Sequence, residues 1–208
     1  MQVSGAFSRD ILTNPVSYTF TYKGITRELP IYEVGGGVRI AYLDSFCDLE
    51  LVRALSVEMA DKIAENPVFL SAEKVVIITA VSKGVPFAYI VGSMLQERFA
   101  DKKIEIAIAR KEIKKFFGEV VTIDKLSITS LGGNDLLALS ESDAAKLAGA
   151  STIVLDDMYS TGASIVALEK LAEKCGANVI DRVVAVWETG NENELPPVKY
   201  CATLPLVK

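Results

Sequence analysis

The sequence predicts an α/β fold in which a parallel central sheet is flanked by helices, and three observations carry this prediction. Short, continuous apolar runs of strand length recur along the chain, and stretches of helical periodicity separate them. These runs lack the alternation of a half-exposed strand, which is typical of parallel strands covered on both faces. The 208 residues, 50% of them hydrophobic, are enough for one domain with a core. We therefore expect a single domain over residues 1–208.

The N-terminal part of the chain, residues 1–47, is expected to form a small β segment. Over residues 16–43, aromatic and β-branched side chains alternate with polar ones, which is typical of short strands. Gly24 and the glycines at 35–37 are predicted to form the turns between these strands.

Strands and helices are predicted to alternate through the rest of the chain, as in a parallel α/β sheet. A first helix begins at the N-cap Asp48 and runs to about Asn66, where Pro67 ends it. The later predicted elements are strands at 75–79, 104–109, 152–155 and 178–187 and helices at about 86–99, 141–148 and 162–175. Residues 110–139 are charged and alternate only weakly, so we expect a long, flexible hairpin there.

One long apolar stretch has the length of a membrane span. Between Val75 and Leu95 the only charged residue is Lys83. Gly84 and Pro86 interrupt the stretch near its middle. We therefore predict a buried strand followed by a buried helix, and no membrane association.

Composition excludes several classes of function. With 22 Lys and Arg against 27 Asp and Glu, the net charge of −5 disfavours binding to DNA. The absence of histidine excludes Ser–His–Asp and Cys–His catalysis and histidine-ligated metal sites. The three cysteines form no Cys-x-x-Cys pair, and the first ten residues lack the pattern of a signal peptide. We expect a cytoplasmic protein with reduced thiols.

The pattern most specific for chemistry is the segment 152–164, TIVLDDMYSTGAS. Four apolar residues form a strand, and Asp156 and Asp157 follow at its carboxyl end, where ligands bind in open α/β sheets. A loop of small and hydroxyl-bearing residues then opens a helix whose free N–H groups can hold a phosphate. Paired acids beside a phosphate site fit a ligand that also offers hydroxyl groups, as a ribose does. The simpler alternative is a solvated turn with ordinary helix capping.

This segment resembles the signature with which type I phosphoribosyltransferases bind 5-phosphoribosyl 1-pyrophosphate (PRPP). Tyr159 is a mild departure, since an aliphatic residue is usual there. Two upstream segments add support by their order: residues 79–84 look like the family's pyrophosphate loop, and residues 109–111 resemble the start of the flexible lid of adenine phosphoribosyltransferases. The resemblance covers about residues 48–187. It implies an enzyme that transfers the 5-phosphoribosyl group of PRPP to a purine base of adenine or xanthine type and releases pyrophosphate. It also implies a homodimer.

The resemblance also implies roles for individual residues. Asp156 and Asp157 would hold the ribose hydroxyls, stabilise positive charge on the sugar and hold Mg²⁺ indirectly, through ribose oxygens and water. The residues expected at the 5′-phosphate are Ser160, Thr161, Gly162, Ala163 and Ser164. Those expected at the pyrophosphate are Lys83, Gly84, Arg110, Lys111 and Lys114. The family often has a non-proline cis peptide in its pyrophosphate loop, so we expect one within 80–83.

Three further features are less specific. Glu119 matches a lid glutamate of the adenine enzymes and could serve a proton on the base, but a surface glutamate on a hairpin is an equally good interpretation. Trp187, at the end of the last predicted strand, could stack on the base, although a core or interface tryptophan is the simpler interpretation. Residues 102–115 hold six cations and two acids, which suits a polyanionic ligand unless this run is only a solvated face.

A second function stays open beside the enzyme. The adenine enzymes usually carry a Glu-x-Arg-like run in the pyrophosphate loop, whereas residues 81–83 are Val-Ser-Lys, and Lys125 replaces an expected lid tyrosine. The Lys-Gly-Val-Pro sequence is closer to the purine-operon repressor family, in which a phosphoribosyltransferase domain senses PRPP. The alternative is therefore a non-catalytic homologue that senses PRPP or a nucleotide. A winged helix for DNA is not expected, because residues 1–47 are predicted as strands.

Overall fold

The computed structural model describes residues 17–35, 38–125, 135–189 and 198–205. The chain has two compact units, one that ends at Leu43 and one that extends from Asp44 to Pro205. We refer to them as the N-terminal unit and the main unit.

Three antiparallel strands form the N-terminal unit: β1 (Ser17–Tyr22), β2 (Ile25–Gly35) and β3 (Val38–Ala41). Between β1 and β2, Lys23 and Gly24 both have positive φ, 47° and 84°, as a two-residue turn between twisted antiparallel strands requires. The predicted strands and the turn at Gly24 are confirmed. The turn expected at 35–37 falls mostly on 36–37, which lie outside the described residues.

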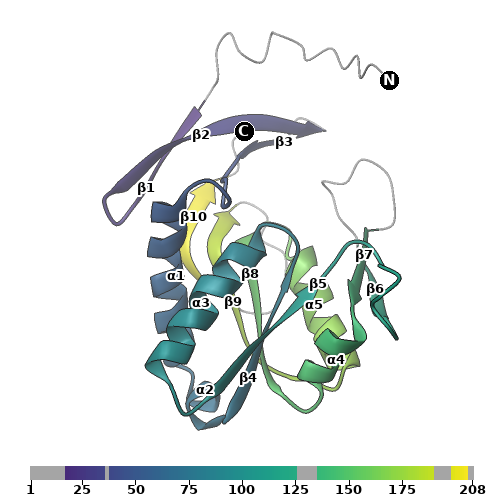
Figure 1. Ribbon diagram of the computed structural model, residues 1–208. Coiled ribbons are helices and arrows are strands. Elements are labelled where there is room, and N and C mark those ends of the chain that lie inside the picture. The colour runs from purple at the N-terminus through teal and green to yellow at the C-terminus, as the bar shows by residue number, and fades with distance from the viewer. Residues whose placement is uncertain (1–16, 36–37, 126–134, 190–197, 206–208) are drawn as a thin grey trace. The chain divides into compact units, whose positions relative to one another are not determined.

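A five-stranded parallel sheet forms the centre of the main unit (Figure 1). Its strands are β4 (Lys74–Ala80), β5 (Lys103–Ala109), β8 (Ser151–Tyr159), β9 (Asn178–Thr189) and β10 (Lys199–Pro205). The order is β10-β9-β8-β4-β5, and every neighbouring pair is parallel. The predicted parallel sheet is confirmed, and β10 is an additional strand that the sequence analysis did not predict. Since β4 has β5 on one side and β8 on the other, the carboxyl ends of β4 and β8 form the switch point of the sheet.

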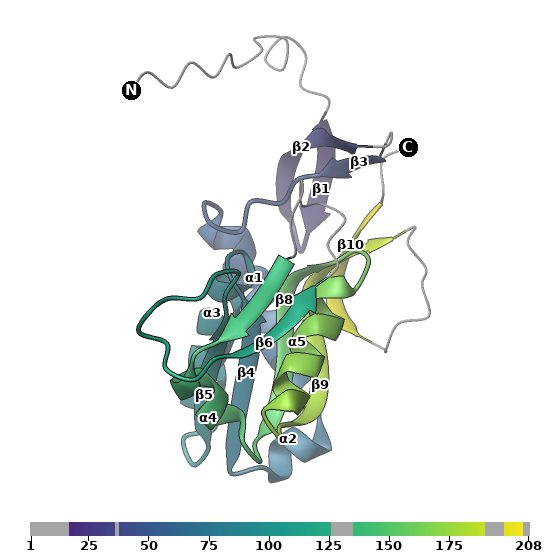
Figure 2. The same cartoon turned by 90° about the vertical axis from the view of Figure 1, so that its right-hand side faces the viewer.

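Helices cover both faces of this sheet (Figures 1 and 2). They are α1 (Leu49–Ala64), α2 (Pro67–Ser71), α3 (Gly84–Arg98), α4 (Glu141–Leu147) and α5 (Ala163–Lys174). α1 and α3 pack together on one face, whereas α4 and α5 lie on the other. Asp48 caps α1 as predicted, by accepting a hydrogen bond from the N–H of Leu51. Pro67 does not simply end a helix, because it opens α2 behind the N-cap Asn66.

The long apolar stretch between residues 75 and 95 folds as predicted, into a strand and a helix. Residues 75–80 of β4 are all buried, which explains why none of these six positions carries a charge. Among the residues that the structure describes, no helix has the length and apolar character needed to cross a membrane.

A hairpin occupies the region predicted to hold one, residues 110–139. Its strands, β6 (Val121–Lys125) and β7 (Asp135–Leu139), pair antiparallel. Arg110 and Ala138 exchange two backbone hydrogen bonds of 2.8 Å, which join the end of β5 to β7. Lys174 of α5 donates to the carbonyl of Thr122 at 3.1 Å. The hairpin is therefore anchored to both β5 and α5.

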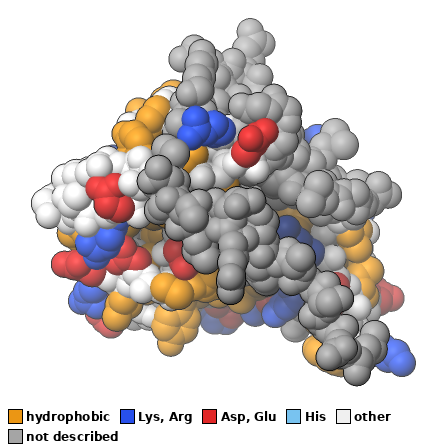
Figure 3. Space-filling view, turned by 90° about the horizontal axis from the view of Figure 1, so that it is seen from above, with side chains coloured by type: hydrophobic (Ala, Val, Ile, Leu, Met, Phe, Trp, Pro, Cys, Tyr) orange, Lys and Arg blue, Asp and Glu red, His pale blue; other side chains and the backbone are white. Residues whose placement is uncertain are grey.

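The basic run over 102–115 is not a single face, which corrects the interpretation drawn from charge alone. Lys102 is buried, and its Nζ donates to the carbonyls of Leu70 and Ala72 at 2.8 Å each. This places Lys102 at the amino end of β5, away from the switch point. Lys103 pairs instead with Glu105 at 3.1 Å. Among the described side chains in the space-filling view, acidic and basic groups lie next to one another (Figure 3).

Candidate functional site

The candidate site lies at the carboxyl ends of β4 and β8. Two loops leave the sheet there: residues 81–83 lead from β4 to α3, and residues 160–162 lead from β8 to α5. Because β4 and β8 are paired neighbours, the segments predicted to bind pyrophosphate and the 5′-phosphate start side by side. The topology brings together two regions about 75 residues apart in sequence.

The loop after β4 contains a cis peptide bond between Val81 and Ser82, within the range where the sequence predicted one. The N–H of Val81 bonds to the carbonyl of Ala109 at 2.9 Å, so β4 and β5 stay paired up to the start of the loop. The buried hydroxyl of Ser45 donates to the carbonyl of Lys83 at 3.1 Å. The loop is thus held by β5 and by the turn before α1. Sequence analysis did not identify Ser45, because its partner lies 38 positions away.

The acid pair lies within β8, not after it, because the strand extends to Tyr159. Asp156 and Asp157 are 7% and 8% exposed. The N–H of Asp157 donates to Oδ1 of Asp156 at 3.0 Å, and Nζ of Lys83 lies 3.9 Å from Oδ2 of Asp157. The structure therefore places both predicted acids at the switch point, with a predicted cation beside them.

Gly84 opens α3 directly beside this pair. A Cβ at Gly84 would lie 2.9 Å from Oδ1 of Asp156 and 2.2 Å from Oγ1 of Thr79. A side chain at this position would therefore require the side chains of Thr79 and Asp156, or the backbone of Gly84, to move. The resemblance placed Gly84 at the pyrophosphate, and the structure shows that its lack of a Cβ is also needed for packing within the site.

The loop after β8 leaves the N-terminus of α5 open. Gly162 is the N-cap residue, with φ of 76°, and it provides no side chain to cap the helix. The hydroxyl of Thr161 accepts a long hydrogen bond, 3.4 Å, from the N–H of Ala163. Ser164 is half-buried in the first turn of the helix. These backbone donors are arranged as a helix N-terminus that binds an anion requires.

Ser160 has a different environment from the rest of this loop. Its hydroxyl donates to the carboxylate of Glu188, a buried residue near the end of β9. A hydroxyl has one hydrogen, so while it is bonded to Glu188 it does not donate to a phosphate. In this structure Ser160 holds the loop against β9. Sequence analysis did not propose a role for Glu188, although an acid that follows an apolar strand is the same pattern that identified Asp156.

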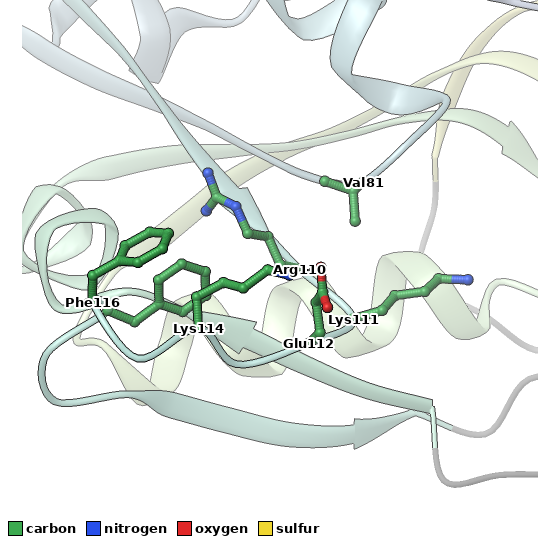
Figure 4. Close-up of a pocket in the computed structure, with 7 residues that line it drawn as sticks. Val81, Arg110, Lys111, Glu112, Lys114 and Phe116 are labelled. Carbon is green, nitrogen blue, oxygen red and sulfur yellow. Dashed lines mark ion pairs between the residues drawn. The ribbon is translucent and has the colours of Figure 1, made fainter.

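A hollow of about 620 Å³ lies between the loop after β4 and the start of the hairpin (Figure 4). The residues that line it are Val81, Arg110, Lys111, Glu112, Lys114, Phe116 and Phe117. Arg110 and Lys111 extend in opposite directions, as Figure 4 shows. Lys114 pairs with Glu112 at 2.6 Å. The predicted pyrophosphate cations of this segment therefore border one hollow but point to different parts of it.

Arg110 is engaged by the protein itself. Its guanidinium donates to Oδ2 of Asp143 at 3.1 Å and lies 5.3 Å from the centre of the Phe117 ring. Burial opposes ionisation of Asp143, but hydrogen bonds and charge from Lys146, Arg110 and Ser140 outweigh it and lower the pKa of Asp143. Asp143 therefore stays ionised and holds one nitrogen of the Arg110 guanidinium, which has further N–H groups.

The two less specific candidates lie in different environments. Glu119 is exposed and lies two residues before the start of β6. Trp187 packs against Tyr200 of β10, with ring centroids 5.0 Å apart, and against the core beneath α5. This packing agrees with the simpler interpretation of Trp187 as a core residue. Its contact with a base stays a prediction.

The donor set suits a metal ion that is only partly bound by protein. Among the described residues, no three side chains of His, Cys, Asp or Glu gather in a group that could hold a metal. Asp156 and Asp157 offer hard carboxylate oxygens of the kind that Mg²⁺ prefers. Two carboxylates do not complete its coordination, so the site fits Mg²⁺ that keeps water and takes further oxygens from a ligand.

Comparisons with known proteins cover nearly the whole main unit. Residues 48–207 match the family model of the phosphoribosyl transferase domain. The purine biosynthesis transcriptional repressor of Bacillus subtilis is 28% identical over 128 residues, which are 62% of this chain and 41% of the repressor. The chain thus spans less than half the length of that relative.

Two solved structures share the fold. The adenine phosphoribosyltransferase of Thermoanaerobacter pseudethanolicus gives a TM-score of 0.58 at 16% identity, over 85% of this chain and 94% of that one. The adenine phosphoribosyltransferase of Saccharomyces cerevisiae, complexed with an imino-altritol bisphosphate and adenine, gives 0.55 at 23% identity, over 76% and 84%. At these identities the likeness concerns the fold alone.

Proposed function

Because the chain belongs to the phosphoribosyl transferase domain family, we propose that it transfers the 5-phosphoribosyl group of PRPP to a purine base and releases pyrophosphate. The observation that carries this proposal is the grouping of three features at one switch point: the acid pair, Lys83 and the open N-terminus of α5. PRPP presents ribose hydroxyls, a pyrophosphate and a 5′-phosphate, and each of these groups suits one of the three features. The active protein in this proposal is a homodimer in the cytoplasm.

The acid pair acts on the sugar in this mechanism. Asp156 and Asp157 accept hydrogen bonds from the ribose hydroxyls, which fixes the sugar above the sheet edge. Their negative charge stabilises the positive charge that builds on the sugar as its bond to pyrophosphate breaks. The same two residues would hold Mg²⁺ indirectly, and the ion would supply charge neutralisation at the pyrophosphate.

The two anionic ends of PRPP bind to different loops. Backbone N–H groups at 162–164, with the hydroxyls of Thr161 and Ser164, bind the 5′-phosphate. The pyrophosphate is bound by Lys83, the backbone at Gly84, Lys111 and Lys114. Arg110 joins them through N–H groups other than the one bonded to Asp143. The hairpin excludes water that would hydrolyse PRPP, and Glu119 serves a proton on the base. Trp187 is only partly buried by Tyr200 and the core, and its remaining surface stacks on the base.

The first test is pyrophosphate release by the purified chain with PRPP and Mg²⁺. Adenine, hypoxanthine, guanine, xanthine, uracil and orotate are offered separately. Release that depends on one purine supports the proposal and identifies the acceptor, whereas release with a pyrimidine alone contradicts it. The matched control is the double variant D156N/D157N, which should release no pyrophosphate while it still unfolds cooperatively.

A PRPP-sensing module is the second candidate, and the 128-residue match to the Bacillus subtilis repressor favours it. In that case PRPP raises the midpoint of thermal unfolding of the wild-type chain, but no base supports pyrophosphate release. The variant E119Q separates the two functions further. It should reduce turnover if the chain is an enzyme and leave PRPP binding unchanged if the chain is a sensor.

A further inference from the structure

The hydroxyl of Thr79 is a buried polar group that no contact among the described residues accounts for. Thr79 is the penultimate residue of β4 and is fully buried. Within the part of the chain that the structure describes, its Oγ1 has no hydrogen-bond partner. Buried hydroxyls in proteins are nearly always satisfied, so an exception at a ligand site calls for a functional explanation.

The position of this hydroxyl indicates its partner. A Cβ built on Gly84 would touch both Oγ1 of Thr79, at 2.2 Å, and Oδ1 of Asp156, at 2.9 Å. The two oxygens, on the neighbouring strands β4 and β8, therefore both lie close to the space that a side chain at Gly84 would occupy. A small rotation of either side chain would let the Thr79 hydroxyl donate to the Asp156 carboxylate, and a hydrogen bond to a charged acceptor is a strong one.

We propose that Thr79 is a positioning residue that acts through Asp156. When Asp156 turns to accept the ribose hydroxyls of PRPP, the Thr79 hydroxyl donates to its carboxylate and holds it in the orientation that binds the sugar. This inference rests on the proposed function, because it uses the role of Asp156 toward ribose. Within the described ranges the hydroxyl has no partner, and the Asp156 carboxylate becomes available to it when the ligand binds.

Removal of the Thr79 hydroxyl should affect the stability of the chain and its PRPP binding differently. Thr79→Val removes the hydroxyl but keeps the shape of the side chain. Since that hydroxyl has no hydrogen-bond partner among the described residues, its loss should not lower the midpoint of thermal unfolding. PRPP binding should weaken about tenfold, the scale of one hydrogen bond to a charged group. Thr79→Ser keeps the hydroxyl and should restore binding.

Thr152→Val is the matched control. Thr152 is equally buried, but its hydroxyl donates to the carbonyl of Ala150 at 3.3 Å, near the amino end of β8. This substitution should lower the midpoint of unfolding and leave PRPP affinity unchanged. The two threonines therefore have opposite expected effects on the two measurements.

The experiment combines calorimetric titration of PRPP in the presence of Mg²⁺ with thermal unfolding of the wild type, T79V, T79S and T152V. Weaker binding by T79V at an unchanged midpoint, with recovery in T79S, supports the inference. Equal PRPP affinity of T79V and the wild type overturns it, and so does a T79V midpoint as low as that of T152V. A wild-type chain that does not bind PRPP overturns the proposed function and this inference with it.

Discussion

The guanidinium of Arg110, where the hairpin begins, lies 3.1 Å from the carboxylate of Asp143 on α4, just beyond the hairpin's end. The backbone pairing of Arg110 with Ala138 joins the same two segments. Asp143 also binds Lys146 at 2.7 Å, so one buried carboxylate serves two cations. The base of the hairpin is thus closed by a cation that the proposed function needs for pyrophosphate.

Asp143→Asn should destabilise the chain, because it removes the charge that both cations share. Asp143 is buried, whereas Arg110 and Lys146 are about a third exposed and partly screened by water. We expect the free energy of unfolding to fall by about 1–2 kcal/mol, measured by urea denaturation at pH 7. The exposed pair of Arg98 and Asp61, at 2.8 Å, is the control.

Asp61→Asn should change the free energy of unfolding by less than about 0.5 kcal/mol, because an exposed ion pair contributes little. The contrary outcome is that D61N and D143N lower the free energy of unfolding equally. The contacts of Asp143 would then stabilise the chain no more than an exposed ion pair does, and they would not close the hairpin.

The lowered pKa of Asp143 predicts a pH dependence with a defined sign. A carboxyl whose pKa is lower in the folded chain binds its proton more tightly when the chain unfolds. Its contribution to stability is therefore full above the ordinary aspartate pKa of about 4 and is lost as the pH falls through the lowered pKa. The difference in unfolding free energy between the wild type and D143N should be constant from about pH 6 to pH 8 and shrink below about pH 4.

Local pattern predicted most of the main unit, because its strands are buried on both faces. Every residue from 75 to 80 is buried, and the corresponding run stands out in the sequence. β10 was not predicted, because it is an edge strand with several partly exposed positions. Polar and apolar residues are mixed in it, so it contains no continuous apolar run of strand length. The five-residue helix α2 is too short to show a period, so Pro67 was interpreted only as a helix end.

The site was predicted as short contiguous segments, whose order along the chain matched the family resemblance. Residues 156–164 follow one another, and their pattern is visible in the sequence. The contacts of Ser45 with Lys83 and of Arg110 with Asp143 join residues 38 and 33 positions apart. Lys102 shows the same limit, because a buried lysine that caps carbonyls has the same local sequence as an exposed one. Such contacts form only in the tertiary fold, so they cannot be predicted from local sequence periodicity.

Gly84→Ala tests the close packing at the switch point. Its Cβ would lie 2.2 Å from Oγ1 of Thr79 and 2.9 Å from Oδ1 of Asp156, so these buried side chains or the start of α3 must move. We expect a loss of about 1–3 kcal/mol in the free energy of unfolding, typical of overpacking, and weaker PRPP binding in calorimetric titration. Gly92→Ala, in the same helix, is the control, because its Cβ would meet Ile106 Cδ1 at 3.4 Å.

Gly92→Ala should be neutral or stabilising, since alanine favours a helix over glycine by about 1 kcal/mol. It should leave PRPP binding unchanged. Equal stability losses in G84A and G92A would show that the effect comes from any side chain added to α3, and not from the contact of Gly84 with Thr79 and Asp156.

Two serines of one loop should have separable effects. Ser160→Ala removes the donor to the buried carboxylate of Glu188, so the free energy of unfolding should fall by about 1–3 kcal/mol. Ser164 lies in the open first turn of α5, and Ser164→Ala should change stability little but weaken PRPP binding about tenfold. Denaturation and calorimetric titration of both variants check this. If S160A reduces PRPP affinity more than S164A does, Ser160 leaves Glu188 to donate to the phosphate, and the assignment made from the unliganded geometry is wrong.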